Sequence, residues 1–163
     1  MRTYNEKELS HWESLDLYRL DIKKAKDFMV EMIENLPNDC LISFEGDLDT
    51  IQKPDFVLDI DKTQNIRRNT IAPRLDFWAV RINYETKDYL IKDFIHRVGI
   101  RDNVVHISVE HESRLIFNSN DNMDPEGVFL SCGNFFSIDL LNKLKMESVI
   151  HEIEKVKTAP NNG

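Results

Sequence analysis

Residues 105–117, VHISVEHESRLIF, decide the fold class. Val105, Ile107 and Val109 alternate with polar residues, which predicts a strand with one apolar face and one polar face. A turn-like HESR follows, and the apolar run 115–117 comes next. Two short strands joined by a tight turn pair in antiparallel fashion, so this hairpin predicts an antiparallel sheet.

Further strand candidates lie on both sides of the hairpin. Short segments rich in β-branched and aromatic residues predict strands over 40–45, 56–61 and 127–131. The run 75–82 has apolar residues on both faces, as expected for a strand that is covered on both sides. The segment 149–156 suits a strand or the end of a helix, and its sequence leaves both open.

Apolar residues spaced three and four apart predict three helices. The first spans 17–36 and ends before a proline. The second spans 87–98, with Thr86 as its N-cap and Gly99 as a left-handed C-cap. The third begins after a capping serine, Ser137.

The predicted order is a helix, three strands, a helix, three strands and a helix. Because strict β-α-β alternation is absent, this order predicts an α+β fold: a mainly antiparallel sheet of about six strands with two or three helices packed on one face. The 163 residues allow a single domain, which we place over 1–157, followed by a frayed C-terminal tail over 158–163.

Composition narrows the classes of function. The chain has 29 acidic and 21 basic side chains and a net charge of −8, so we expect neither nucleic acid nor a membrane as its partner. Two cysteines and the lack of an apolar leader or spanning segment predict a cytoplasmic protein with reduced thiols. The sequence contains no phosphate-binding glycine loop, zinc-ligand spacing or hydrolase motif, so we predict no cofactor and no metal.

Charge is unevenly distributed along the chain. Residues 39–61 carry seven acids and one lysine, whereas residues 62–81 carry five bases and one aspartate. The basic stretch, with Arg67, Arg68 and Arg74 close to Trp78, resembles a single-strand binding surface only in composition. We expect these bases to pair with the protein's own acids instead.

The acidic stretch supplies the candidate site. Alternating acids in extended chain project from one side, which predicts an acidic patch of Glu45, Asp47, Asp49, Asp59 and Asp61. Such a patch would steer a basic protein partner, so the sequence favours a non-enzymatic binding protein, such as an immunity-type or antitoxin-like inhibitor. Converging carboxylates also bind Mg²⁺ or Ca²⁺, and a solvated surface is the plainest alternative.

An enzyme is the alternative class of function. His106 and Glu110 share the polar face of a predicted strand, and His111 follows them, so the three residues offer a general acid–base pair for a small hydrolase. The paired aspartates Asp59 and Asp61 would instead serve a metal-dependent enzyme. The identity of a partner or substrate and the oligomeric state stay open.

Overall fold

Seven strands form the main sheet of the computed structural model, which describes residues 3–159: β2 (Leu17–Ile22), β3 (Leu41–Gly46), β4 (Asp76–Arg81), β5 (Val104–His111), β6 (Arg114–Ser119), β7 (Val128–Ser131) and β8 (Ile150–Lys155). Their order is β4-β3-β5-β6-β7-β2-β8, and all neighbours pair in antiparallel fashion. The predicted α+β class with a mainly antiparallel sheet is therefore confirmed, with seven strands in place of about six.

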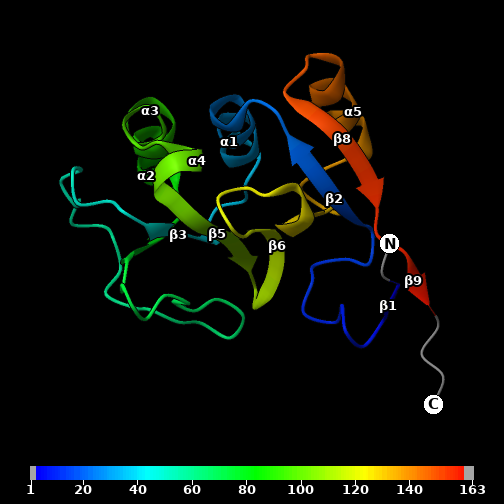
Figure 1. Ribbon diagram of the computed structural model, residues 1–163, viewed down its shortest axis with the longest axis horizontal. Coiled ribbons are helices and arrows are strands. Elements are labelled where there is room, and N and C mark those ends of the chain that lie inside the picture. Colours follow the sequence, from blue (N-terminus) through cyan, green and yellow to red (C-terminus); the bar gives the residue numbers. More distant parts are fainter. Residues whose placement is uncertain (1–2, 160–163) are drawn as a thin grey trace.

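Helices cover one face of this sheet, as Figure 1 shows. They are α1 (Ala25–Glu34), α2 (Tyr84–Tyr89), the π-helical turn η1 (Leu90–Phe94), α3 (Ile95–Arg97), α4 (Ile100–Asn103) and α5 (Ile138–Met146). Phe44 of β3 packs against Phe94, with ring centroids 4.7 Å apart, and Phe28 of α1 packs against Phe117 of β6 at 5.6 Å. These fully buried rings belong to the larger of two apolar cores, between the helices and the sheet.

The opposite face of the sheet carries the smaller core. The chain before β2 contributes Leu9 and Trp12, the connection between β3 and β4 contributes Ile66, and the sheet contributes Phe77 and Leu115. Irregular segments thus cover the face that the helices leave free. This double coverage explains why the β4 segment is apolar on both faces.

The predicted helix over 17–36 is wrong in its first third. Leu17–Ile22 forms β2, between β7 and β8, and α1 begins only at Ala25. Leu17, Leu20 and Ile22 are the buried residues of β2, and their spacing fits a helix almost as well as a strand. Periodicity alone does not separate the two in a short apolar run, whereas pairing with two neighbouring strands does.

The predicted strand over 56–61 is also wrong, because this segment crosses the edge of the sheet. Val57 packs into the core on the helical side, whereas Leu58 packs against the smaller core on the other side. The only ladder contact in the segment is an isolated bridge in which Leu58 N donates to Ala79 O of β4 at 2.8 Å.

The second helix begins earlier than predicted. Asn83 is its N-cap: the Asn83 side chain accepts from Thr86 N at 2.9 Å, and Thr86 Oγ1 accepts from Asn83 N at 3.0 Å. This capping box fixes the start of α2 at Tyr84. Gly99 is not a left-handed C-cap, because its φ is −80° and it precedes α4.

The C-terminal region forms an edge strand. The segment 149–156, left open by its sequence, contains β8, and Ser137 caps α5 as predicted. Two residues of the predicted tail form the short strand β9 (Thr158–Ala159), which pairs in parallel with β1 (Tyr4–Asn5). The rest of that tail, 160–163, lies outside the described residues.

Candidate functional site

The connection between β3 and β4, residues 47–75, is the candidate functional site, and we call it the β3–β4 loop. It contains no strand or helix, only isolated bridges. Connections longer than about 15 residues without secondary structure are uncommon in a packed domain and usually carry function. Asp47, Asp49, Asp59 and Asp61, four of the five predicted patch residues, lie in this loop.

The fifth predicted residue, Glu45, is an anchor and not part of a surface. Its side chain lies on β3 and is buried, with the residue 1% exposed. The carboxylate accepts hydrogen bonds from Asn69 N at 2.9 Å, Thr70 N at 2.7 Å and Thr70 Oγ1 at 2.7 Å. A buried carboxylate with three donors is satisfied inside the protein, so Glu45 fastens the loop to the sheet.

Glu110 of β5 provides a second anchor for the same loop. Its Oε2 accepts from Thr63 Oγ1 at 2.9 Å and from Asn65 N at 3.2 Å. Glu110 is also buried. Two glutamates on neighbouring strands therefore hold the β3–β4 loop by its backbone and by threonine hydroxyls.

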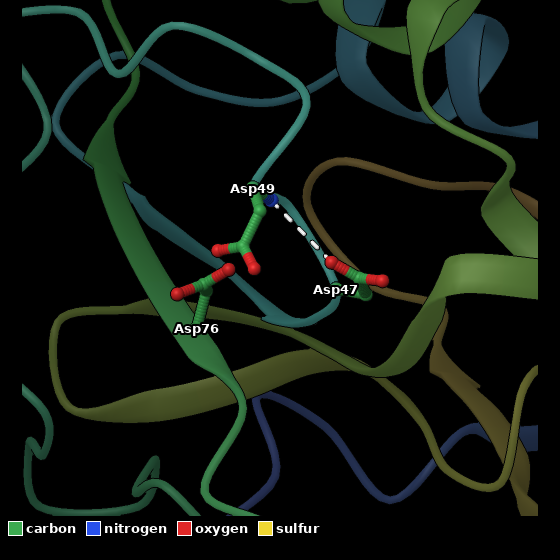
Figure 2. A group of neighbouring side chains, drawn as sticks. All are labelled: Asp47, Asp49 and Asp76. Atoms are coloured by element: carbon green, nitrogen blue, oxygen red, sulfur yellow. Dashed lines mark hydrogen bonds between the residues drawn. The ribbon is translucent and has the colours of Figure 1, made fainter.

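Asp47, Asp49 and Asp76 form an acidic cluster where the loop leaves β3 and enters β4 (Figure 2). One carboxylate oxygen from each lies within 4.8 Å of the others. Leu48 is buried between the two loop aspartates, and its backbone N donates to Asp76 Oδ2 at 3.1 Å. Asp49 N donates to Asp47 Oδ1 at 3.5 Å. Asp47 and Asp49 thus lie close together, although both follow the end of β3 at Gly46 and are not part of a strand.

The acidic cluster carries unrelieved negative charge. A hydrogen bond that protonated Asp49 donates to Asp76, followed by the charges of Asp76 and Asp47, raises the pKa of Asp49. Within residues 3–159 no ion pair joins the three carboxylates to a lysine or arginine. Such a cluster can receive a basic side chain, or a divalent cation that prefers oxygen ligands.

Asp59 and Asp61 are not members of the acidic cluster. Both are exposed, and Asp61 Oδ2 lies 3.7 Å from Arg74 Nη2. Because no strand forms over 56–61, the alternation that would align these two carboxylates does not apply. The third member of the acidic cluster is Asp76, which lies there because Gly46 pairs with Asp76 in the β3–β4 register.

The residues of the alternative enzyme site are only partly brought together. Glu110 and His111 line a hollow of about 410 Å³ together with Arg81, and His106 does not. His106 pairs with Glu45 in the β3–β5 register, and its buried Nδ1 has no hydrogen-bond partner among the described residues. Within the described residues, no hydrogen bond joins the side chains of His106, Glu110 and His111 to one another.

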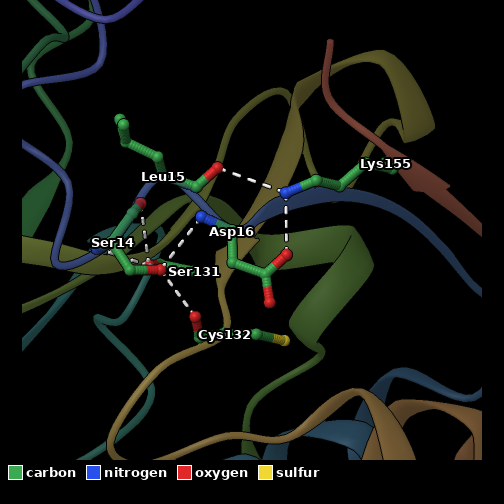
Figure 3. A network of polar contacts seen from close by, with 6 residues as sticks. All are labelled: Ser14, Leu15, Asp16, Ser131, Cys132 and Lys155. Carbon is green, nitrogen blue, oxygen red and sulfur yellow. Dashed lines mark hydrogen bonds and ion pairs between the residues drawn. The ribbon is translucent and has the colours of Figure 1, made fainter. Parts of the chain in front are cut away.

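Cys132 lies beside a network that fixes the chain before β2 (Figure 3). Ser14 Oγ donates to Cys132 O at 2.5 Å and lies 3.0 Å from Ser131 Oγ, while Lys155 Nζ donates to Asp16 Oδ1 at 2.7 Å. Burial raises the pKa of the Cys132 thiol to about 12. A nucleophilic cysteine needs a lowered pKa, so this burial disfavours a nucleophilic role for Cys132.

Comparisons of the chain with protein-family models, curated proteins and solved structures give no match. No helix of the described residues has the length and apolar character needed to cross a membrane. The sheet and the loop contacts described above define the class of protein: an α+β domain with a long loop held by two buried glutamates.

Proposed function

We propose that this chain is a non-enzymatic binding protein that engages a basic protein through the acidic cluster Asp47, Asp49 and Asp76. The observation that supports this proposal is the approach of three carboxylates to within 4.8 Å without a basic partner among the described residues. Like charges held together cost free energy in the free protein, and a lysine or arginine from a partner would remove that cost.

The surroundings of the acidic cluster suit recognition by a rigid surface. Buried Leu48 fixes the start of the loop, and Asp76 belongs to β4 itself. A pre-formed site loses little conformational entropy when a partner docks. Asp59 adds to the field that steers the partner, whereas buried Glu45 does not touch it.

An immunity-type or antitoxin-like inhibitor in the cytoplasm is the form of this function that we favour. A small domain with a net charge of −8 and a pre-formed acidic cluster suits rapid neutralisation of a basic protein. Neither nucleic acid nor a membrane is part of the proposal.

Affinity capture from native lysate tests the proposal with three proteins. They are the wild type, Asp47→Asn/Asp49→Asn, and a control, Glu34→Gln/Glu152→Gln, that removes two exposed acids elsewhere. We expect one basic protein to bind the wild type and the control in stoichiometric amount and to be lost from the cluster variant. Its association rate should also fall with added salt. Equal capture by all three proteins would contradict the proposal.

A metal-dependent enzyme is the second candidate, favoured by the same spacing of carboxylate oxygens. A thermal-shift series with Mg²⁺, Ca²⁺ and Mn²⁺ separates it from the first. A cation that binds only the folded protein stabilises it by about 2.7 kcal/mol at a hundred times its Kd. Saturable stabilisation by one cation, lost in Asp47→Asn/Asp49→Asn, would favour this candidate.

A further inference from the structure

The second half of the β3–β4 loop borders an open hollow of about 420 Å³. We call it the basic hollow, and its charged and apolar lining comprises Asp61, Lys62, Arg67, Arg68, Ile71 and Arg74. Four bases and one acid give this lining a formal charge of +3. The lining is thus positively charged although the whole chain has a net charge of −8.

The sequence predicted that the bases of the hollow would pair with the protein's own acids. In the structure most of them do not. The one ion pair among them in the described chain joins Arg74 to Asp61 at 3.7 Å, between side chains that are 65% and 53% exposed. Lys62 and Arg67 pair with no acid of residues 3–159. Exposed pairs of this kind contribute little, so the repulsion between the four cations persists.

The backbone under these cations is firmly held. Thr70, which is bound by buried Glu45, accepts a hydrogen bond from Leu75 N at 2.9 Å through its hydroxyl. Arg68 N donates to Asp61 O at 2.8 Å and closes the loop across the hollow.

The side chain of Arg68 is also fixed. Its Nη1 donates to Leu75 O, and its guanidinium lies 5.7 Å from the centroid of the Phe77 ring. A cation above an aromatic face is stabilised by the ring quadrupole. Arg68 is thus a fixed cation at the hollow, whereas Lys62, Arg67 and Arg74 around it are exposed.

We infer that the basic hollow binds a small ligand that carries a diphosphate group. Guanidinium groups pair with the oxygens of phosphate through two parallel hydrogen bonds, which favours an oxyanion over a halide. Each phosphoryl group carries roughly −1.5 to −2, so two of them match the +3 of the lining. The volume falls within the range of about 300–1,000 Å³ that is typical of small-ligand sites.

The same surroundings disfavour a long polyanion. A nucleic acid strand would extend beyond the hollow over a chain of net charge −8. Ile71, which is 87% exposed at the rim, offers an apolar contact to the rest of a small ligand. This inference uses other residues than the acidic cluster and does not rest on the proposed function.

Isothermal titration with inorganic pyrophosphate tests the inference, at constant ionic strength and without divalent cations. The wild type should bind one equivalent saturably. Arg67→Gln/Arg74→Gln should weaken binding by about ten- to a hundredfold, because each guanidinium loses charge-assisted hydrogen bonds. The control Lys26→Gln/Lys145→Gln removes two exposed charges on α1 and α5 and should retain the affinity. Circular dichroism verifies that both variants fold.

Four results would overturn the inference. The first is a titration without saturable heat, and the second is an equal loss of affinity in the control variant. The third is tighter binding of a single-stranded oligonucleotide than of pyrophosphate, lost in Arg67→Gln/Arg74→Gln, which would point to nucleic acid. The fourth is binding of sulfate as strong as that of pyrophosphate, which would exclude specificity for a diphosphate.

Discussion

Replacing Glu45 by glutamine is expected to detach the β3–β4 loop from the sheet at its second half. The carboxylate accepts three hydrogen bonds, two from backbone N–H groups and one from a hydroxyl, at 2.7–2.9 Å. A hydrogen bond to a charged group contributes about 1.5–3 kcal/mol, against about 0.5–1.5 kcal/mol for a neutral pair. Loss of charge therefore costs about 1 kcal/mol per bond, or about 3 kcal/mol for the three.

Thermal unfolding followed by circular dichroism measures this cost. A domain of this size loses about 2–4 °C in Tm per kcal/mol, so Glu45→Gln should lower Tm by about 6–12 °C. Hydrogen exchange localises the effect: the amides of Asn69 and Thr70, which donate to the carboxylate, should exchange faster than those of the central strands. Glu34→Gln, on the exposed side of α1, is the matched control.

The reasoning would be refuted by an unfolding midpoint and loop exchange rates in Glu45→Gln equal to those of the wild type. That result would mean that the glutamine side chain satisfies the same donors without charge, so that Glu45 is not an electrostatic anchor. Faster exchange over the whole sheet, without a preference for Asn69 and Thr70, would likewise show that the side chain supports the core and not the loop.

Three further predictions concern other parts of the chain. Asp49→Asn should stabilise the free protein at pH 7. The raised pKa of Asp49 means that its charged form is less favourable in the folded protein than in the unfolded chain, and asparagine removes this cost. Near pH 3, where Asp49 is protonated, the advantage should disappear, and urea unfolding at both pH values checks this. The thiols of Cys40 and Cys132 should react slowly with a thiol reagent at pH 8 unless urea is present, because burial raises both pKa values to about 12; equal rates would contradict this. Glu112→Asn with Ser113→Gly should stabilise the hairpin by about 1 kcal/mol, since both residues have positive φ (49° and 64°); a calorimetric Tm that fails to rise would exclude it.

Local patterns predicted the parts of the fold that local contacts determine. Residues 105–110 alternate apolar and polar side chains, whereas 115–117 and 127–131 are short runs rich in β-branched and aromatic residues, and the structure has β5, β6 and β7 there. The region 17–36 was mispredicted because the state of Leu17–Ile22 depends on pairing with β7 and β8, more than a hundred residues later. No window along the sequence contains that information.

The same limit applies to the candidate site. Asp47 and Asp49 are neighbours in the sequence, whereas Asp76 joins them only through the β3–β4 register. Glu45 was placed on a surface because alternation assigns a residue to one face of a strand without showing what covers that face. Here the β3–β4 loop covers it and supplies the donors.

The two proposed sites depend on different supports, and this separates them experimentally. The acidic cluster is fixed by buried Leu48 and by Asp76 on β4, whereas the basic hollow depends on the hydrogen bonds of Glu45 to 69–70. Glu45→Gln should therefore weaken pyrophosphate binding while leaving capture of a basic partner intact. Isothermal titration and affinity capture on the same variant measure both, and joint loss would mean that the loop is a single cooperative unit. Because both anchors hold the loop largely by backbone groups and threonine hydroxyls, its charged side chains remain available for binding.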